Sequence, residues 1–228
     1  MEIAKVEPGV SGPNTGILRT QTFRYILDNL IQSPKGSRLV DLGAGPCIFS
    51  RISAGRGFDV TAVDGRDERK PDDLEVPFVK SDVRTFDVSD FQVILIIGLL
   101  YHLTLDDQID LLSRCPKSSE LVVDTQVHIP ELVGAASAAE RQGFADRPVS
   151  DRGYGGILFP EADNPMAAIG NRVSWWHTEP SLMTLFENAG FEHVTEVAPP
   201  YTSKYGARRW YVVSNPRALD ARLSGTAA

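Results

Sequence analysis

The sequence predicts an α/β fold built on a mostly parallel sheet with helices on both faces. A buried strand runs into a glycine-rich turn and a helix within Arg38–Ser50. Strands and helices then alternate along the chain, and Phe91–Leu100 is almost continuously apolar, as expected for a central strand covered on both faces. The 228 residues suffice for one such domain with a full core.

We expect three regions along the chain. Residues 1–36 form an arm and a lid helix, residues 37–215 form the α/β domain, and residues 216–228 form a tail. Within the domain, residues 128–177 break the alternation with many Gly, Ala, Pro and Asp residues. A loop-rich insertion of this length in a compact domain is usually functional, so we place the substrate cover there.

Each element has its own sequence signal. Apolar residues recur at helical spacing after residue 17, Thr104 and Thr178 are of a type that caps helices, and Gly190 is typical of a helix end. Residues 1–16 are expected to be irregular, and the tail to be a short helical turn that frays. The predicted elements, in order, are the helix Leu18–Ile31, the strand and helix of Arg38–Ser50, the strand Gly57–Gly65, a short strand within Val76–Phe86, the strand Phe91–Leu100, the helix Thr104–Cys115, the strand Glu120–Val127, a short helix at Glu131–Gln142, the helix Thr178–Phe191, and the β segments His193–Pro199 and Arg208–Pro216.

Charge and composition exclude several classes of protein. The net charge of -7 and the pI near 5.1 argue against nucleic-acid binding, which needs clustered Lys and Arg, and favour a small neutral or cationic substrate. No apolar run is long enough to span a bilayer, and the first residues lack the apolar core of a secretory signal. We therefore expect no membrane association and a cytoplasmic protein. Cys47 and Cys115 are expected to be free thiols, Cys47 as a packing residue rather than a nucleophile.

The glycine-rich turn is interpreted as a cofactor loop. Gly43 and Gly45 can adopt backbone angles closed to other residues and let a ligand approach the main chain, and Pro46 suits the first turn of a helix. Asp41 would lie at the carboxyl end of the first strand, where open α/β sheets place their ligands. The alternative is an ordinary strand–turn–helix in which Asp41 caps the helix.

A second acid strengthens this interpretation. Asp64 ends the next strand, about twenty residues past the glycines, where a ribose-binding acid is expected. The alternative is that Asp64 only forms a turn.

Together, these residues resemble the class I S-adenosylmethionine-dependent methyltransferases of the small-molecule type, over roughly Arg38 to Asn215. LVDLGAGP is similar to the family's glycine motif, and VILIIGLLYHL to its fourth motif. The resemblance implies a Rossmann-like seven-stranded sheet, mostly parallel with an antiparallel last strand, and S-adenosylmethionine as cofactor. It implies that the cofactor is bound by Asp41, Gly43, Ala44, Gly45, Asp64, Gly65, Ser81, Asp82, Val83, Gly98 and Leu99.

One further segment, WHTEPSL at Trp176 to Leu182, looks like the branch of the family that transfers a carboxymethyl group to tRNA wobble uridine. The acidic charge and the lack of a basic stripe argue against extending this likeness to RNA modification.

The expected reaction is methyl transfer to a hydroxyl oxygen of a small molecule. Alignment of donor and acceptor supplies most of the acceleration of such a displacement, and a histidine base suits a hydroxyl acceptor near neutral pH. His102, His128 and His177 follow strands or close the insertion, so they are the candidate bases, whereas His193 lies in an exposed turn. The alternative for each is a histidine satisfied by a backbone carbonyl or stacked on the cofactor.

An apolar substrate pocket is expected around four aromatic residues, and core packing is the alternative for at least one tryptophan. These residues are Tyr101, Tyr154, Trp175 and Trp176.

Other functions stay open. Nitrogen is the nearest rival acceptor atom. A nicotinamide-dependent oxidoreductase is disfavoured because Ile48 stands where dehydrogenases have a third glycine, and a binding module without catalysis is a further alternative. Asp124 and His128 are two potential metal ligands without a third, so no metal is predicted. A homodimer is one option for the assembly.

Overall fold

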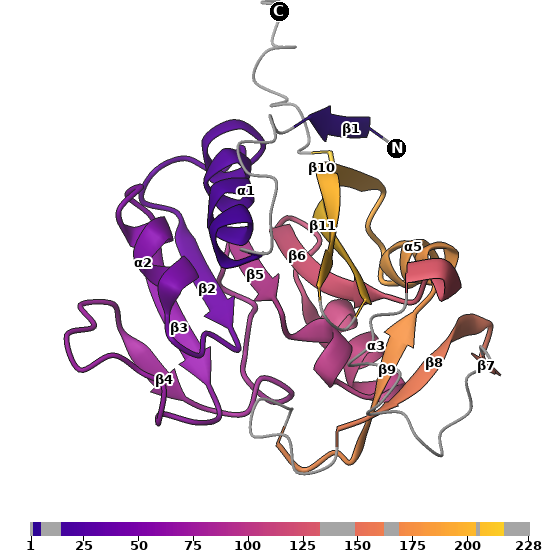
Figure 1. The fold of residues 1–228 in the computed structure, drawn as a ribbon. Coiled ribbons are helices and arrows are strands. Elements are labelled where there is room, and N and C mark those ends of the chain that lie inside the picture. Colours follow the sequence, from indigo (N-terminus) through magenta and orange to yellow (C-terminus); the bar gives the residue numbers. More distant parts are fainter. Residues whose placement is uncertain (1, 6–14, 133–148, 162–168, 204–205, 217–228) are drawn as a thin grey trace, which may run out of the picture.

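Eight strands form the central sheet, in the order β1-β10-β11-β6-β5-β2-β3-β4 (Figure 1). The computed structural model describes residues 2–5, 15–132, 149–161, 169–203 and 206–216. The strands are β1 (Glu2–Lys5), β2 (Arg38–Leu42), β3 (Asp59–Asp64), β4 (Phe78–Lys80), β5 (Val93–Ile97), β6 (Glu120–Val127), β10 (His193–Ser203) and β11 (Gly206–Ser214).

The predicted mostly parallel sheet is confirmed. Strands β2 to β6 pair in parallel, and β11 runs antiparallel to both of its neighbours, β6 and β10. The seven expected strands are present. The prediction that residues 1–16 are irregular was wrong at Glu2–Lys5, which pairs in parallel with β10 and adds an eighth strand. The outer edge of β10 offers unpaired backbone groups to such a strand. This pairing is a tertiary contact, so the sequence of the four residues alone does not indicate it.

Helices cover both faces of the sheet, as predicted, and each face has its own apolar core. The helices α1 (Thr15–Asn29) and α2 (Ile48–Ala54) border one face, where Phe23 packs with Trp210. The helices α3 (Leu105–Arg114) and α5 (Glu179–Asn188) border the other, where Phe186 packs with Tyr211. All five residues of β5 are buried, because this central strand is covered from both sides.

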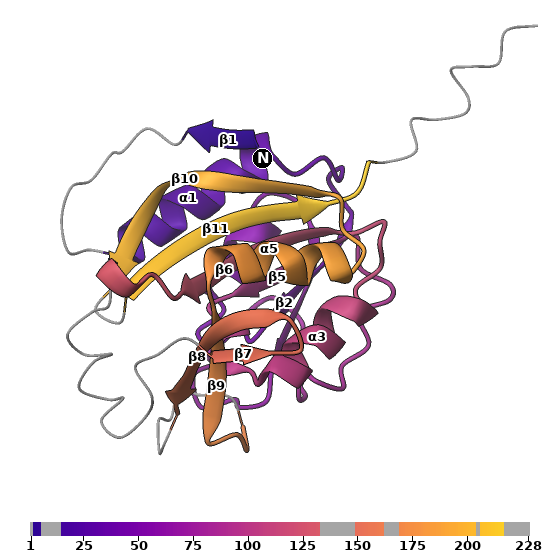
Figure 2. The same cartoon turned by 90° about the vertical axis from the view of Figure 1, so that its right-hand side faces the viewer.

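The insertion contains a second, antiparallel sheet of β7 (Val149–Asp151), β8 (Tyr154–Pro160) and β9 (Val173–His177). Figure 2 shows it beside α5 and α3. The prediction of a region without regular structure was therefore wrong over these strands. Its signal was misleading because Gly156 suggests a loop, whereas packing requires it: a Cβ there would lie 2.6 Å from the Trp175 ring.

The second sheet is attached to the main domain by hydrogen bonds to the backbone of Trp175. The Trp175 N–H donates to the carbonyl oxygen of Leu103 at 3.0 Å, and the Gln108 amide donates to the carbonyl oxygen of Trp175 at 2.8 Å. Of the helix expected at Glu131–Gln142, only the end of a 3₁₀ turn, η2 (Pro130–Leu132), is described. The rest of that segment and the tail from residue 217 lie outside the described residues. None of the described helices is both long enough and apolar enough to cross a membrane.

Candidate functional site

A cavity of about 570 Å³ opens at the carboxyl ends of β2, β3 and β5. This is the end of a parallel sheet at which α/β proteins bind ligands, and the volume suits a small molecule. Among the predicted cofactor and substrate residues, the cavity is lined by Gly43, Ala44, Gly45, Asp64, Gly65, Asp82, Val83, Gly98, Leu99, Tyr101, His102 and Trp176.

The glycine loop has the backbone geometry that its sequence predicts. Gly43 and Gly45 have φ angles of 70° and 49°, which side chains disfavour. The N–H groups of Gly43 and Ala44 both donate to the carbonyl oxygen of Val63, at 2.8 and 3.0 Å, so the loop crosses the end of β3. α2 begins at Ile48, two residues later than Pro46 suggests.

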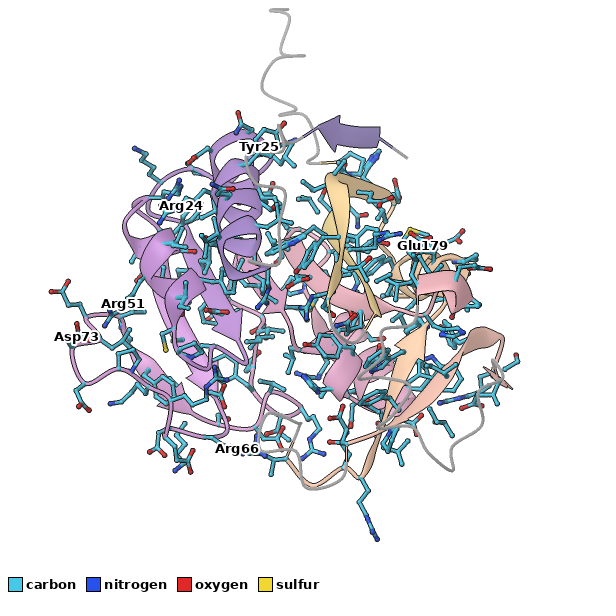
Figure 3. All side chains as sticks on the ribbon, viewed as in Figure 1. Arg24, Tyr25, Arg51, Arg66, Asp73 and Glu179 are labelled. Atoms are coloured by element: carbon cyan, nitrogen blue, oxygen red, sulfur yellow. The ribbon has the colours of Figure 1, made fainter. Side chains whose placement is uncertain are left out.

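Asp64 fixes the loop to β3 through both of its carboxylate oxygens. Oδ2 accepts a hydrogen bond from the Gly45 N–H at 2.8 Å, and Oδ1 accepts one from the Arg66 N–H at 2.9 Å. Arg66 lies at the rim of the domain (Figure 3). Each carboxylate oxygen has a further lone pair, so Asp64 can accept additional hydrogen bonds from a ligand in the cavity.

Asp41 and Ser81 do not line the cavity. Asp41 is 1% exposed and accepts a hydrogen bond from the Ser50 hydroxyl at 2.6 Å. Burial raises the pKa of Asp41 to about 6. Asp41 therefore connects β2 to α2 beneath the loop, and any effect on a ligand passes through these elements.

Asp82 faces the cavity in an ion pair. Arg84 donates to both carboxylate oxygens, at 2.6 Å for the shortest bond, and this hydrogen bonding lowers the pKa of Asp82. Arg84 also donates to the carbonyl oxygen of Ile169 at 2.9 Å. The Ile169 side chain covers Gly65, where a Cβ would lie 2.4 Å from Ile169 Cδ1. Ile169 of the insertion thus borders this end of the cavity.

His102 is the candidate base that lines the cavity. Its Nδ1 lies 2.9 Å from Oε1 of Glu161, whose side chain is fully buried. A carboxylate accepts from the Nδ1 hydrogen, which leaves the lone pair of the imidazole on Nε2. His102 follows β5 in the 3₁₀ turn η1 (Leu100–His102), and Glu161 follows β8.

His177 lies away from the cavity. The Trp175 indole donates to its Nδ1 at 3.3 Å, and the Ser181 hydroxyl oxygen lies 2.7 Å from the same nitrogen. Burial lowers the pKa of His177 to about 3, so the ring stays neutral. Its Nε2 is buried and has no hydrogen-bond partner among the described residues. Because these contacts hold the His177 ring away from the cavity, His177 does not reach a ligand bound there.

Three other predicted residues, His128, Tyr154 and Trp175, are also packed outside the cavity. His128 is buried, and its backbone N–H donates to the carbonyl oxygen of His177 at 2.8 Å. Tyr154 accepts a hydrogen bond from Asn188 of α5 at 2.9 Å. The three residues join the insertion to the main domain.

An aromatic wall borders the His102 end of the cavity. The Phe159 and Trp176 rings stack at 4.2 Å, and the Tyr101 ring meets Trp176 edge-on at 5.9 Å. The Trp176 indole donates to the carbonyl oxygen of Tyr101 at 3.0 Å. The three aromatic rings thus form an apolar border at this end of the cavity.

Asp124 is occupied by arginines and is unsuited to a metal. Arg208 donates to its two oxygens at 3.0 and 2.7 Å, and Arg19 donates at 2.9 Å. Within the ranges that the structure describes, no group of three His, Cys, Asp or Glu residues could hold a metal ion. The cysteines Cys47 and Cys115 are buried and free, and burial raises the pKa of Cys47 to about 11.

Comparison with solved structures identifies the fold. The N-terminal domain of EvdMO1, crystallised in the presence of SAH and D-fucose, superposes with a TM-score of 0.64 at 22% identity, over 90% of this chain and 84% of that chain. The 1,6-didemethyltoxoflavin-N1-methyltransferase of Burkholderia thailandensis, with bound 1,6-didemethyltoxoflavin and S-adenosylhomocysteine, gives 0.52 at 18% identity, over 92% and 93%. An S-adenosylmethionine-dependent methyltransferase of Mesorhizobium loti gives 0.52 at 16%, over 82% and 95%.

The fold is that of the class I S-adenosylmethionine-dependent methyltransferases. No family model matches the sequence, and no curated protein does. The expected Rossmann-like architecture is confirmed.

Several residues at this site were missed by sequence reasoning. Glu161, Phe159 and Ile169 come from the insertion, which has no periodic pattern, so no local signal marked them. Arg84 could have been found, because an arginine two residues after Asp82 is a ready partner for that carboxylate.

Proposed function

We propose that the protein binds S-adenosylmethionine and transfers its methyl group to a hydroxyl oxygen of a small molecule, with His102 as the general base. One observation carries the proposal: a single cavity joins the glycine loop and Asp64 at one end to the His102–Glu161 pair at the other. A transfer reaction needs this arrangement, because donor and acceptor must share one enclosed space in line.

The loop end fits a nucleoside-containing cofactor. Gly43 and Gly45 leave the backbone open to a ligand, and Asp64 retains acceptor capacity for sugar hydroxyls. Gly65 and Ile169 present an apolar surface between Asp64 and Asp82. Two of the similar structures were crystallised with S-adenosylhomocysteine (SAH), which supports this choice of ligand. When bound, S-adenosylmethionine supplies a methyl group that an oxygen lone pair can displace.

The other end fits a hydroxyl acceptor. Nε2 of His102 is the nitrogen left to take the hydroxyl proton, since Nδ1 is held by Glu161. Glu161 fixes the orientation of the His102 ring through this contact. The wall of Tyr101, Phe159 and Trp176 positions the acceptor and limits the access of water.

A nitrogen acceptor is the alternative, and the toxoflavin-type relative is an N1-methyltransferase. The need for a base distinguishes the two acceptors, because an amine with a free lone pair needs less help from His102 than a hydroxyl does.

The test is a screen of metabolite pools with S-adenosylmethionine carrying a labelled methyl group, read by mass spectrometry. We expect a labelled methyl ether. Binding of S-adenosylhomocysteine and of NAD is compared in parallel by thermal shift. A melting temperature raised by NAD and unchanged by S-adenosylhomocysteine would overturn the proposal.

A further inference from the structure

The insertion holds the turn that carries His102 through three consecutive backbone carbonyls. The carbonyl oxygen of Tyr101 accepts from a β9 indole at 3.0 Å, and that of Leu103 accepts from the Trp175 N–H at 3.0 Å. Between them, the carbonyl oxygen of His102 accepts from Nδ2 of Asn171 at 2.7 Å. The position of this turn, and with it the direction of the His102 ring, therefore depends on the chain around β9.

Asn171 makes its contact with a side-chain amide whose orientation is fixed. Nδ2 also donates to the carbonyl oxygen of Val173 at 3.3 Å, so both neighbours of this nitrogen are acceptors. Oδ1 is buried and has no hydrogen-bond partner among the described residues. A buried acceptor left unsatisfied costs free energy of folding. Stability alone therefore does not account for an asparagine at this position.

The same segment reaches the opposite end of the cavity. Ile169 lies two residues before Asn171, and its Cδ1 covers Gly65, where a Cβ would lie 2.4 Å away. The Ile169 carbonyl oxygen accepts from Nη2 of Arg84 at 2.9 Å, and this nitrogen also donates to Oδ2 of Asp82 at 2.6 Å. Gly65, Asp82 and Ile169 all line the cavity. A ligand bound between Gly65 and Asp82 therefore lies against this segment.

We propose that Asn171 is a positioning residue for His102, and that the segment Ile169–Asn171 couples the nucleoside end of the cavity to the base. Gly170 is the residue between the two contacts, and its φ of 85° lies in the left-handed region that favours glycine. The connection is thus a single turn, so a displacement of Ile169 by a ligand is passed on to the carbonyl of His102. This proposal deepens the proposed function and rests on it.

Nuclear magnetic resonance of the His102 ring tests the coupling without an acceptor. Protein with isotope-labelled histidine gives a ring signal for each of its four histidines, and His102→Gln assigns the signal of His102. S-adenosylhomocysteine is then added to saturation, which calorimetry verifies. We expect the His102 signal of the wild type to move, and Asn171→Ala to lose at least roughly half of this movement, as for a residue within a connecting network. The signal of the exposed His193 should stay in place.

Asn29→Ala is the matched control. The Nδ2 of Asn29 also donates to a backbone carbonyl, that of Tyr25 at 2.9 Å, but on the exposed side of α1. This variant should keep the full movement of the His102 signal.

Arg84→Gln tests the link at the nucleoside end and decides the matter if Asn171→Ala does not fold. It removes the ion pair with Asp82 and should likewise reduce the movement of the His102 signal. Two results would overturn the coupling: a full movement in the folded variant, or no movement in the wild type although S-adenosylhomocysteine binds.

Kinetics separate positioning from a merely structural role. With the acceptor found in the labelled-methyl screen, Asn171→Ala should lower kcat about 10- to 100-fold, because misplacement of a reacting group by about 1 Å can cost about 10²-fold. The KM for S-adenosylmethionine should stay within about twofold of the wild-type value. An unchanged kcat would overturn the positioning role of Asn171.

Failure of the proposed function gives a different result. S-adenosylhomocysteine would then not bind to the wild type. Asn171→Ala would still move the His102 signal of the unliganded protein, because the contact with the His102 carbonyl does not depend on a ligand.

Discussion

Glu161 places a carboxylate oxygen 2.9 Å from Nδ1 of His102, although 59 residues separate the two in the sequence. His102 follows the central strand β5, and Glu161 follows β8 of the second sheet. The end of the cavity that we propose for the acceptor is therefore built jointly by the main α/β domain and by the insertion.

Replacing His102 tests its role as base. We expect His102→Gln to lower kcat about 10²- to 10⁴-fold with a hydroxyl acceptor, the usual contribution of a general base, and to leave the affinity for S-adenosylhomocysteine within about twofold. Steady-state kinetics and calorimetry measure the two effects. His193→Gln, at an exposed histidine, is the control. Equal losses of kcat and cofactor affinity would indicate a structural role instead.

Glu161 is a positioning residue whose effect passes through His102. We expect Glu161→Ala to lower kcat at least about tenfold, and Glu161→Gln to lower it less, because the amide oxygen still accepts from Nδ1. In the double variant, adding Glu161→Ala to His102→Gln should lower kcat little further, because the effects of residues that act as a unit are not additive. Additive losses in kcat would contradict the pairing.

Asp64 holds the glycine loop and is expected to bind the cofactor sugar. Asp64→Ala removes the acceptor of the Gly45 N–H as well as any bond to the ligand. We expect the Kd for S-adenosylhomocysteine to rise at least about tenfold, since a hydrogen bond to a charged group contributes about 1.5–3 kcal/mol. Asp59→Ala, at the exposed opposite end of β3, should leave the Kd unchanged. If Asp64→Ala leaves the Kd unchanged, Asp64 only forms a turn and does not bind the cofactor.

Asp41 should make the ligand-free protein less stable as pH rises. Its folded pKa is about 6 against 3.8 for the free group, so the folded state binds the proton more tightly. This stabilisation is complete below pH 3.8 and is lost as pH rises through 6. We expect the stability of Asp41→Asn, measured as the free energy of unfolding relative to the wild type, to increase by roughly 2.5 kcal/mol between pH 4 and pH 8. Urea denaturation measures the difference; a constant difference across this range would refute it.

His177 should have the opposite effect. Its folded pKa of about 3 lies below the free value of 6.5, so only the unfolded state takes up a proton in this range. The associated stability is present above pH 6.5 and is lost as pH falls. Between pH 7 and pH 5 the wild type should lose roughly 2 kcal/mol that His177→Gln does not lose. Denaturation curves of the two proteins at both pH values test this, with His193→Gln as a variant that keeps the wild-type dependence.

The sequence predicted the main sheet well because its signals are local. The alternation of strands and helices, the glycine turn and the apolar strand β5 each depend on neighbouring residues. Asp64, Asp82 and Gly98 lie where strands end, so their positions at the cavity followed from the parallel sheet. Their roles in cofactor binding stay predictions.

The insertion could not be predicted in the same way. Gly156 and Trp175 owe their conformations to contacts with each other, and Glu161 reaches His102 only after the second sheet has folded. For the three histidines, a position after a strand did not indicate which way the side chain points. His102 points into the cavity, whereas His177 points to Ser181.

The placement of Glu161 has a consequence for attempts to retarget the protein. Its neighbour Phe159 belongs to the aromatic wall, so exchanging this segment for one from another protein of this fold would alter the wall and, in the same step, deprive His102 of its buried carboxylate partner. Engineers who graft a new cover onto this scaffold must therefore also supply an acid at the position of Glu161.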